Sequence, residues 1–199
     1  MNLSTGRRWT ASVKHGRCWI LSTPTLSTRT LTWAKDKVFE NRGCRADNRE
    51  QVMRMDRGTS TIRTITIHLP HGAVAGEITG NDRYLVWIQG KMHGNGDGRV
   101  ILMDMTSGRI IPVTAAGSDN AMINEDMLVW HGQGGRTVGV LNLHVWRYYV
   151  LDRFHHSTSI STSPGLFGQP WGKRLVWVSY RSPDAGGPSQ FFLDIADLP

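Results

Sequence analysis

The sequence predicts an all-β protein built from repeated four-stranded sheets, and three observations lead to this prediction. Leu-Val-Trp triplets end at Trp87, Trp130 and Trp177, with separations of 43 and 47 residues. The segments between the triplets divide into short strands joined by polar, Gly-rich loops. The triplets also lie in apolar runs that neither alternate nor follow helical spacing. Four short strands in each repeat of 40-odd residues are typical of the blades of a β-propeller.

A second anchor in each repeat supports this alignment. Phe39 lies 48 residues before Trp87 and marks an earlier, weaker copy. Asp56 and Asp104 each follow the aromatic residue of their copy by 17 residues, as Asp194 follows Trp177. In the third copy Asn142 follows Trp130 by only 12 residues, as a shorter loop would allow. We expect the three Asp residues to accept N–H groups of the turn that follows each strand, which is a structural role.

Each copy is then assigned four elements in order. The lead-in strands are LTW, GEI, NAMI and GQPW, and each leads to the strand that carries the aromatic anchor. The third strands are VMRMD, VILMD, VGVLN and QFFLD, and the fourth strands are TIRTIT, RIIPVT and WRYYVL. Residues 45–55 are expected to be a loop that enters a strand, with a turn or two of helix as the alternative. The predicted blades are residues 30–70, 75–116, 119–156 and 167–199, after a basic, poorly ordered arm at 1–29.

The continuous apolar runs have a physical explanation in this fold. Each blade packs face to face against its neighbours, so its middle strands are covered on both faces and need not alternate. Each buried Trp then contributes several kcal/mol, at about 25 cal/mol per Å² over roughly 150–250 Å². An ordinary β-sandwich is the alternative, but a sandwich does not require the repeat.

The segment GQPWGKRLVWVSYRS (168–182) resembles the TolB-type, or PD40 (WD40-like), propeller repeat. The family pattern runs P-x-W-S-P-D-G-K-x-I-A-F-x-S, and the residues that fit it are Pro170, Trp171, Lys173, Leu175, Trp177 and Ser179. LTWAKDKVFE (31–40) and VILMDMTSGRIIPVT (100–114) resemble other parts of the repeat. The S-P-D-G turn is shortened to a single glycine here.

This resemblance implies a propeller but does not specify its function. Proteins of this type include periplasmic scaffolds, cell-surface proteins and the propellers of prolyl-oligopeptidase-like enzymes, so it implies a periplasmic or extracellular location. Such propellers usually have six or more blades, and about four are recognised here. We therefore expect part of a larger propeller. The alternative is a four-bladed ring in which RCWILST (17–23) supplies the missing outer strand and removes the open edges.

Charge and composition restrict the classes of partner. The net charge of +7 comes from residues 1–72, which hold thirteen Lys/Arg against five Asp/Glu. These charges are scattered, so a solvated arm is favoured over nucleic-acid binding. No apolar run is long enough to span a bilayer, and no secretory signal is recognised. Cys18 and Cys44 are expected to be free thiols.

No catalytic, cofactor or metal motif is found. There is no G-x-S-x-G, no P-loop and no H-E-x-x-H, and GNGDG (94–98) is expected to be a hairpin loop. We therefore expect a non-catalytic scaffold that binds a protein or cell-surface component. The alternative is the substrate-gating propeller of a peptidase or glycosidase whose catalytic domain lies elsewhere. In propellers the loops from second to third strands and from fourth strands to the next blade share one face. The predicted partner-binding residues on that face are Arg42, Arg45, His93, Asp97, His131, Arg136, His155, His156, Arg181 and Asp184.

Overall fold

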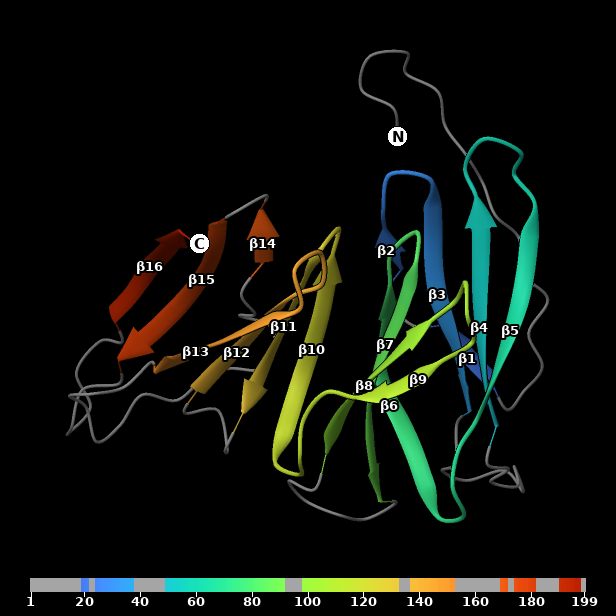
Figure 1. Ribbon diagram of the computed structural model, residues 1–199, viewed down its shortest axis with the longest axis horizontal. Helices are drawn as coiled ribbons and strands as arrows, with labels where there is room; N and C mark the ends of the chain where they lie inside the picture. The colour runs from blue at the N-terminus through green and yellow to red at the C-terminus, as the bar shows by residue number, and fades with distance from the viewer. Residues whose placement is uncertain are drawn as a thin grey trace.

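The computed structural model describes residues 19–21, 24–37, 49–91, 98–132, 137–152, 169–171, 174–181 and 190–197. All regular elements in these ranges are β-strands, and they form four antiparallel sheets. Figure 1 shows the sheets side by side in chain order, with the first at the right and the fourth at the left. The predicted all-β class is confirmed.

The sixteen strands fall into four consecutive groups along the chain. The first sheet holds β1 (Trp19–Leu21), β2 (Thr25–Leu26), β3 (Thr30–Lys37), β4 (Arg49–Asp56) and β5 (Ile62–His68). The second holds β6 (Ala73–Gly80), β7 (Tyr84–Lys91), β8 (Arg99–Asp104) and β9 (Ile110–Pro112). The third holds β10 (Ser118–Asn124), β11 (Met127–Gly132), β12 (Thr137–Asn142) and β13 (Arg147–Asp152). The fourth holds β14 (Gln169–Trp171), β15 (Arg174–Arg181) and β16 (Gln190–Asp197).

These sheets have the arrangement of propeller blades. Within the second and third sheets each strand pairs with the next along the chain, so spatial order equals sequence order. The first strands β2, β6, β10 and β14 contact one another from sheet to sheet. Strands β6 and β10 also carry a bulge at the same place in the repeat, between Gly76 and Thr79 and between Asp119 and Met122. The propeller prediction is confirmed for the blades described.

The first blade differs from the prediction. β1 and β2 both pair with one edge of β3 and together take the place of a first strand. The segment LTW therefore lies in the second strand and is not a lead-in strand. The first sheet thus begins at Trp19, before the predicted boundary at residue 30. The strand proposed to close a ring pairs with β3, so in this structure it does not complete the fourth sheet. Residues 49–55 are strand, as expected.

The strand register corrects two of the repeat anchors. Trp87 lies opposite Ile101, three residues before Asp104, and Trp33 lies opposite Met53, three residues before Asp56. Trp33 is therefore the structural equivalent of Trp87, and the assignment of Phe39 to this position is wrong. The 17-residue spacing misled because the first blade has a longer loop between its second and third strands.

The same test changes the acid of the fourth copy. Trp130 lies opposite Gly139, three residues before Asn142, so the assignment of Asn142 is confirmed. Trp177 lies opposite Asp194 itself, which places the equivalent acid at Asp197. Asp194 is a mid-strand residue, and its assignment to the end of the third strand is wrong.

The middle strands are covered on both faces, as predicted. Along β7, Leu85 and Trp87 pack against the first blade, whereas Tyr84 and Val86 pack against the third. Along β11, Leu128 and Trp130 face the second blade, and Met127 and Val129 join a further cluster on the opposite face. All eight side chains are buried, because each blade interface removes one face of the strand from water.

The acids at the ends of the third strands have the structural role that the sequence indicates. Asp56 Oδ1 accepts N–H groups of Gly58 and Thr59 at 2.8 and 2.9 Å. Asp104 Oδ1 accepts the N–H of Thr106 at 2.8 Å, and Asn142 Oδ1 accepts that of His144 at 3.0 Å. These bonds hold equivalent turns in three blades. They explain Asp56 and Asp104 without a catalytic role.

Candidate binding groove

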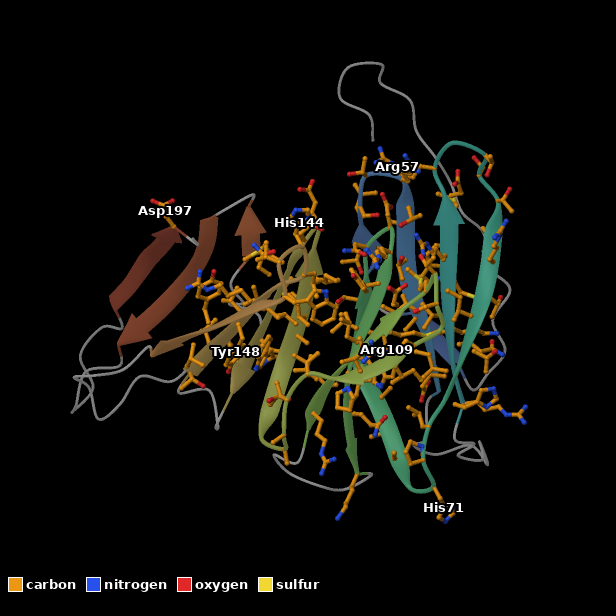
Figure 2. All side chains as sticks on the ribbon, in the orientation of Figure 1. Arg57, His71, Arg109, His144, Tyr148 and Asp197 are labelled. Atoms are coloured by element: carbon orange, nitrogen blue, oxygen red, sulfur yellow. The ribbon has the colours of Figure 1, made fainter. Side chains whose placement is uncertain are left out.

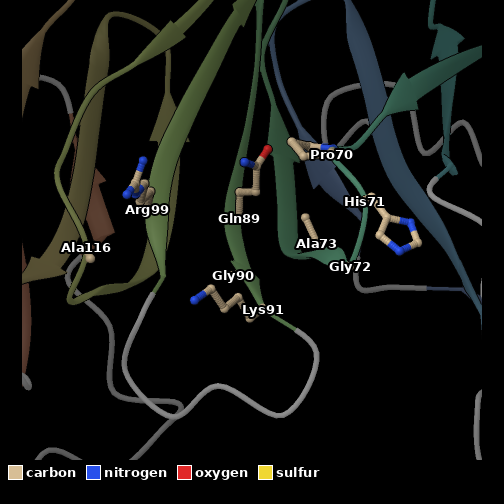
Figure 3. A pocket seen from close by; sticks show the side chains of 9 residues that line it. All are labelled: Pro70, His71, Gly72, Ala73, Gln89, Gly90, Lys91, Arg99 and Ala116. Atoms are coloured by element: carbon tan, nitrogen blue, oxygen red, sulfur yellow. The ribbon is translucent and has the colours of Figure 1, made fainter.

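The loops from fourth strands to the next blade gather at one end of the sheets, together with the ends of β7 and β8. Figure 2 shows His71, in the β5–β6 connection, at the end of the molecule opposite to Arg57 and His144, which lie in third-to-fourth-strand turns. A groove of about 320 Å³ opens there. Its lining is Pro70, His71, Gly72, Ala73, Gln89, Gly90, Lys91, Arg99 and Ala116, and we call it the Lys91 groove (Figure 3).

A tight turn builds one side of the groove. The N–H of Ala73 donates to the carbonyl of Pro70 at 3.0 Å, and Gly72 has a φ of 74°. A glycine with positive φ at the third position is what a type II turn requires. The turn leaves His71 exposed at its apex and begins β6 directly opposite the end of β7, since Ala73 pairs with Lys91.

A close backbone contact fixes the other side. The N–H of Ser118 donates to the carbonyl of Gly98 at 2.8 Å, which joins the start of β10 to the residue before β8. A Cβ on Gly98 would lie 2.3 Å from the Ser118 carbonyl oxygen, so a residue with a side chain does not fit without a shift of the backbone. The second and third blades are thereby held together beside Ala116.

The polar side chains of the groove come from neighbouring strand ends. Gln89 and Arg99 are directly opposite each other in the β7–β8 ladder, and Lys91 follows Gln89 on the same face of the sheet. Figure 3 shows these three side chains around Gly90, with Pro70 to Ala73 on the other side of the groove. The remaining lining is small or apolar, so the groove has room around its polar groups.

The groove carries positive charge that the described residues do not neutralise. Lys91 and Arg99 are exposed, and neither has an ion pair or hydrogen bond within the described ranges. None of the nine lining residues is an Asp or Glu. Two like charges at adjacent strand ends give a local positive potential, which favours an anionic ligand.

Most of the predicted site residues lie outside the part of the chain that the structure describes. These are Arg42, Arg45, His93, Asp97, Arg136, His155, His156 and Asp184. Arg181 ends β15, and only its backbone is described. Cys18 and Cys44 are outside the described ranges as well.

His131 differs from its predicted place on a loop. It lies in β11 opposite Val138, and only 4% of it is exposed. The ladder between β11 and β12 continues as far as Gly132 and Thr137, so the strand extends two residues beyond Trp130. In this structure His131 is a buried strand residue, and it is not presented to a partner.

Sequence reasoning missed the residues that line the groove. Attention to loop interiors led to His93 and Asp97, whereas Lys91 and Arg99 are the strand residues on either side of that loop. The available signal was the pattern Q-G-K before the loop and G-R after it. Pairing the two strands from their apolar residues would have placed Gln89, Lys91 and Arg99 on one face.

The described residues show no cluster suited to a metal ion, since no three of their His, Cys, Asp or Glu side chains come together. Within the same residues, no helix has the length and apolar character needed to cross a membrane.

Comparison with known proteins gives only weak likenesses in structure. No protein-family model and no curated protein sequence matches the chain. A chain in the crystal structure of a nidogen/laminin complex superposes with a TM-score of 0.42 and 15% identity, over 76% of this chain and 54% of that one. The tricorn protease superposes with a TM-score of 0.39 and 8% identity, over 89% of this chain and 25% of that one. The chain thus spans about half of the first structure and a quarter of the second. Scores this low carry no argument about function, and the propeller assignment rests on the sheet order and packing above.

Proposed function

We propose that this chain is a non-catalytic β-propeller scaffold that binds another protein at the Lys91 groove. The observation that supports the proposal is a groove of about 320 Å³ with two exposed, unpaired cations at its edge. Exposed unpaired cations add little to folding stability, so their positions are free to serve recognition. Loops and strand ends held by a rigid scaffold are the usual place for such recognition.

The scaffold below the groove is well suited to hold it in one shape. β7 is covered by apolar clusters on both faces, and its last residues extend directly from that core into the groove. Side chains that are already held in place lose less conformational entropy when a ligand binds. Recognition at strand ends is therefore less costly than recognition by a long flexible loop.

The finer assignment to the TolB-type family belongs to the same proposal. It is supported by the pattern in residues 168–182, which also suggests an interaction role of the kind known for such scaffolds. The periplasmic or extracellular location, the protein partner and the absence of catalysis are parts of this proposal, and each follows from that resemblance or from the motifs sought in the sequence.

Selection of peptides provides a test that does not require the partner to be identified first. Random peptides would be selected for binding to the purified protein and then measured against two variants. Ala116→Trp fills the groove, whereas Ala115→Trp places the same bulk on an exposed neighbour that does not line it. We expect the selected peptides to lose at least about tenfold in affinity, roughly 1.4 kcal/mol, for Ala116→Trp only. Equal binding to both variants and to the unchanged protein would exclude the groove as the binding site.

The alternative function makes a different prediction. If the chain is the substrate-gating propeller of a peptidase or glycosidase, the groove ligand is a substrate of that enzyme. The ligand would then be hydrolysed when the catalytic domain is supplied, whereas a scaffold leaves it intact. Analysis of the bound peptide by mass spectrometry before and after addition of that domain distinguishes the two functions.

A further inference from the structure

We propose that the Lys91 groove binds an extended acidic segment of its protein partner, with two carboxylate side chains spaced two residues apart. This inference rests on the proposed function and adds the chemistry and spacing of the ligand. It is carried by the positions of Lys91 and Arg99 in the strand register together with the absence of acids from the described lining.

The register sets the distance between the two cations. Arg99 is directly opposite Gln89, and Lys91 lies two residues further along β7 on the same face. Diagonal neighbours of this kind have Cβ atoms roughly 7–8 Å apart. In an extended peptide, residues i and i+2 point to the same side and are about 6.5–7 Å apart. Two acidic residues at that spacing would therefore meet one cation each.

The remaining lining favours an extended protein segment. Gly72, Ala73, Gly90 and Ala116 leave space close to the backbone, and a Cβ on Gly72 would meet no atom within 4 Å. The amide of Gln89, half-buried between the two cations, is placed to bond with a peptide backbone group. Arg99 supplies a planar donor that fits a carboxylate in a two-point arrangement.

The same lining argues against nucleic acid as the ligand. None of the described groove residues is aromatic, so a base would have no side chain on which to stack. Two cations also form a short patch and not the row of phosphate contacts that supports nucleic-acid binding.

The experiment measures affinity for two peptides of equal composition. Gly-Glu-Ser-Glu-Gly has its acids two residues apart, and Gly-Ser-Glu-Glu-Gly has them adjacent, so that only one faces the groove when the peptide is extended. We expect the first to bind about fivefold more tightly. Lys91→Gln and Arg99→Gln should each lower its affinity by roughly three- to fivefold, and the double variant by about tenfold or more. Added salt should weaken binding to the unchanged protein.

Arg109→Gln is the matched control for loss of one positive charge. Arg109 is exposed after the turn at the far end of β8, and its replacement should leave the affinity unchanged. Urea unfolding of each variant checks that the fold is kept. Because Lys91 and Arg99 have no partner among the described residues, their replacement should not lower stability by a measurable amount.

Three results would overturn the inference. The two peptides could bind equally well, or the double variant could bind as well as the unchanged protein. A phosphoserine peptide could bind more than tenfold more tightly than Gly-Glu-Ser-Glu-Gly, which would assign the groove to phosphate. The peptide selection separates this failure from that of the proposed function. Selected peptides that are blocked by Ala116→Trp but carry no acids would retain the function and reject the acidic ligand.

Discussion

Ser60, Gly108 and Trp146 occupy one position in the turns that join third to fourth strands, four residues after Asp56, Asp104 and Asn142. Their φ angles are 59°, 71° and 52°, so all three adopt the left-handed conformation. Only glycine takes this conformation without a steric penalty. The repeat therefore shows a shared backbone requirement that the residue types alone conceal, because Ser and Trp do not signal a positive φ.

A matched pair of substitutions tests this requirement. Ser60 and Gly108 each donate their N–H to the carbonyl of the preceding acid at 2.8 Å, so the turns are equivalent. Ser60→Gly should raise the free energy of unfolding by about 0.5–1 kcal/mol, and Gly108→Ser should lower it by about 1 kcal/mol. Urea unfolding followed by circular dichroism measures both. Changes of the same sign in the two variants would contradict the shared requirement.

At the scale of the strand, the third blade depends on a glycine opposite its tryptophan. Trp130 pairs with Gly139, and its ring stacks on Tyr148 of the next strand with centroids 5.5 Å apart. A Cβ on Gly139 would lie 2.2 to 2.6 Å from three atoms of the indole. The ring thus covers a residue that has no side chain to pack, which compensates for glycine within a strand.

Replacement of this glycine should disturb the whole blade. Gly139→Ala should lower the free energy of unfolding by about 1–3 kcal/mol, because the ring must leave its position over β12. Gly76→Ala is the control, since its Cβ would meet nothing within 4 Å. Thermal unfolding together with Trp fluorescence measures both variants. A loss for Gly76→Ala as large as that for Gly139→Ala would show that strand glycines matter here for another reason.

At the scale of the whole molecule, polar bonds between turns supplement the apolar interfaces. Asp82, in the β6–β7 turn, accepts hydrogen bonds from Ser27 Oγ at 2.5 Å, Thr30 Oγ1 at 3.0 Å and the Arg29 N–H at 3.1 Å. Asn81 in the same turn donates to the carbonyl of Glu125 in the third blade. These bonds connect three successive blades through their first turns.

The Asp82 connection should respond to acid. Partial burial alone would raise the pKa of this carboxyl, but the bonds from Ser27, Thr30 and Arg29 outweigh it and hold the pKa below its usual value of 3.8. A lowered folded-state pKa means that the stabilisation is complete above about pH 4 and is lost as the pH falls through the folded-state value. Asp82→Ala should therefore cost about 1–3 kcal/mol at pH 7 and progressively less below pH 4.

Denaturation of the unchanged protein and of Asp82→Ala at pH 7, 4.5 and 3 measures this convergence. Asp126→Ala removes an exposed carboxylate from the corresponding turn of the third blade, whose side chain has no hydrogen bond within the described residues, and serves as the control. A constant difference between Asp82→Ala and the unchanged protein across these pH values would rule out a role for the ionised carboxylate.

The Leu-Val-Trp periodicity and the strand-end acids were sufficient to predict the all-β class, the blades and the turn role of Asp56 and Asp104. Local apolar pattern and turn chemistry reside in the residues themselves, so they can be read without coordinates. The errors at Phe39 and Asp194 arose where loop length varies, because spacing along the chain is not spacing across a ladder.

What the sequence determined by itself is the repeat, since continuous burial of a strand on both faces leaves a continuous apolar run. What only the tertiary structure decided is the register and the Lys91 groove. The cations of the groove flank a loop whose interior attracted the prediction, and they meet a turn from the preceding blade. Such a site depends on which strand ends are brought together, and this is fixed by hydrogen-bonded pairing and blade packing between residues distant in the sequence.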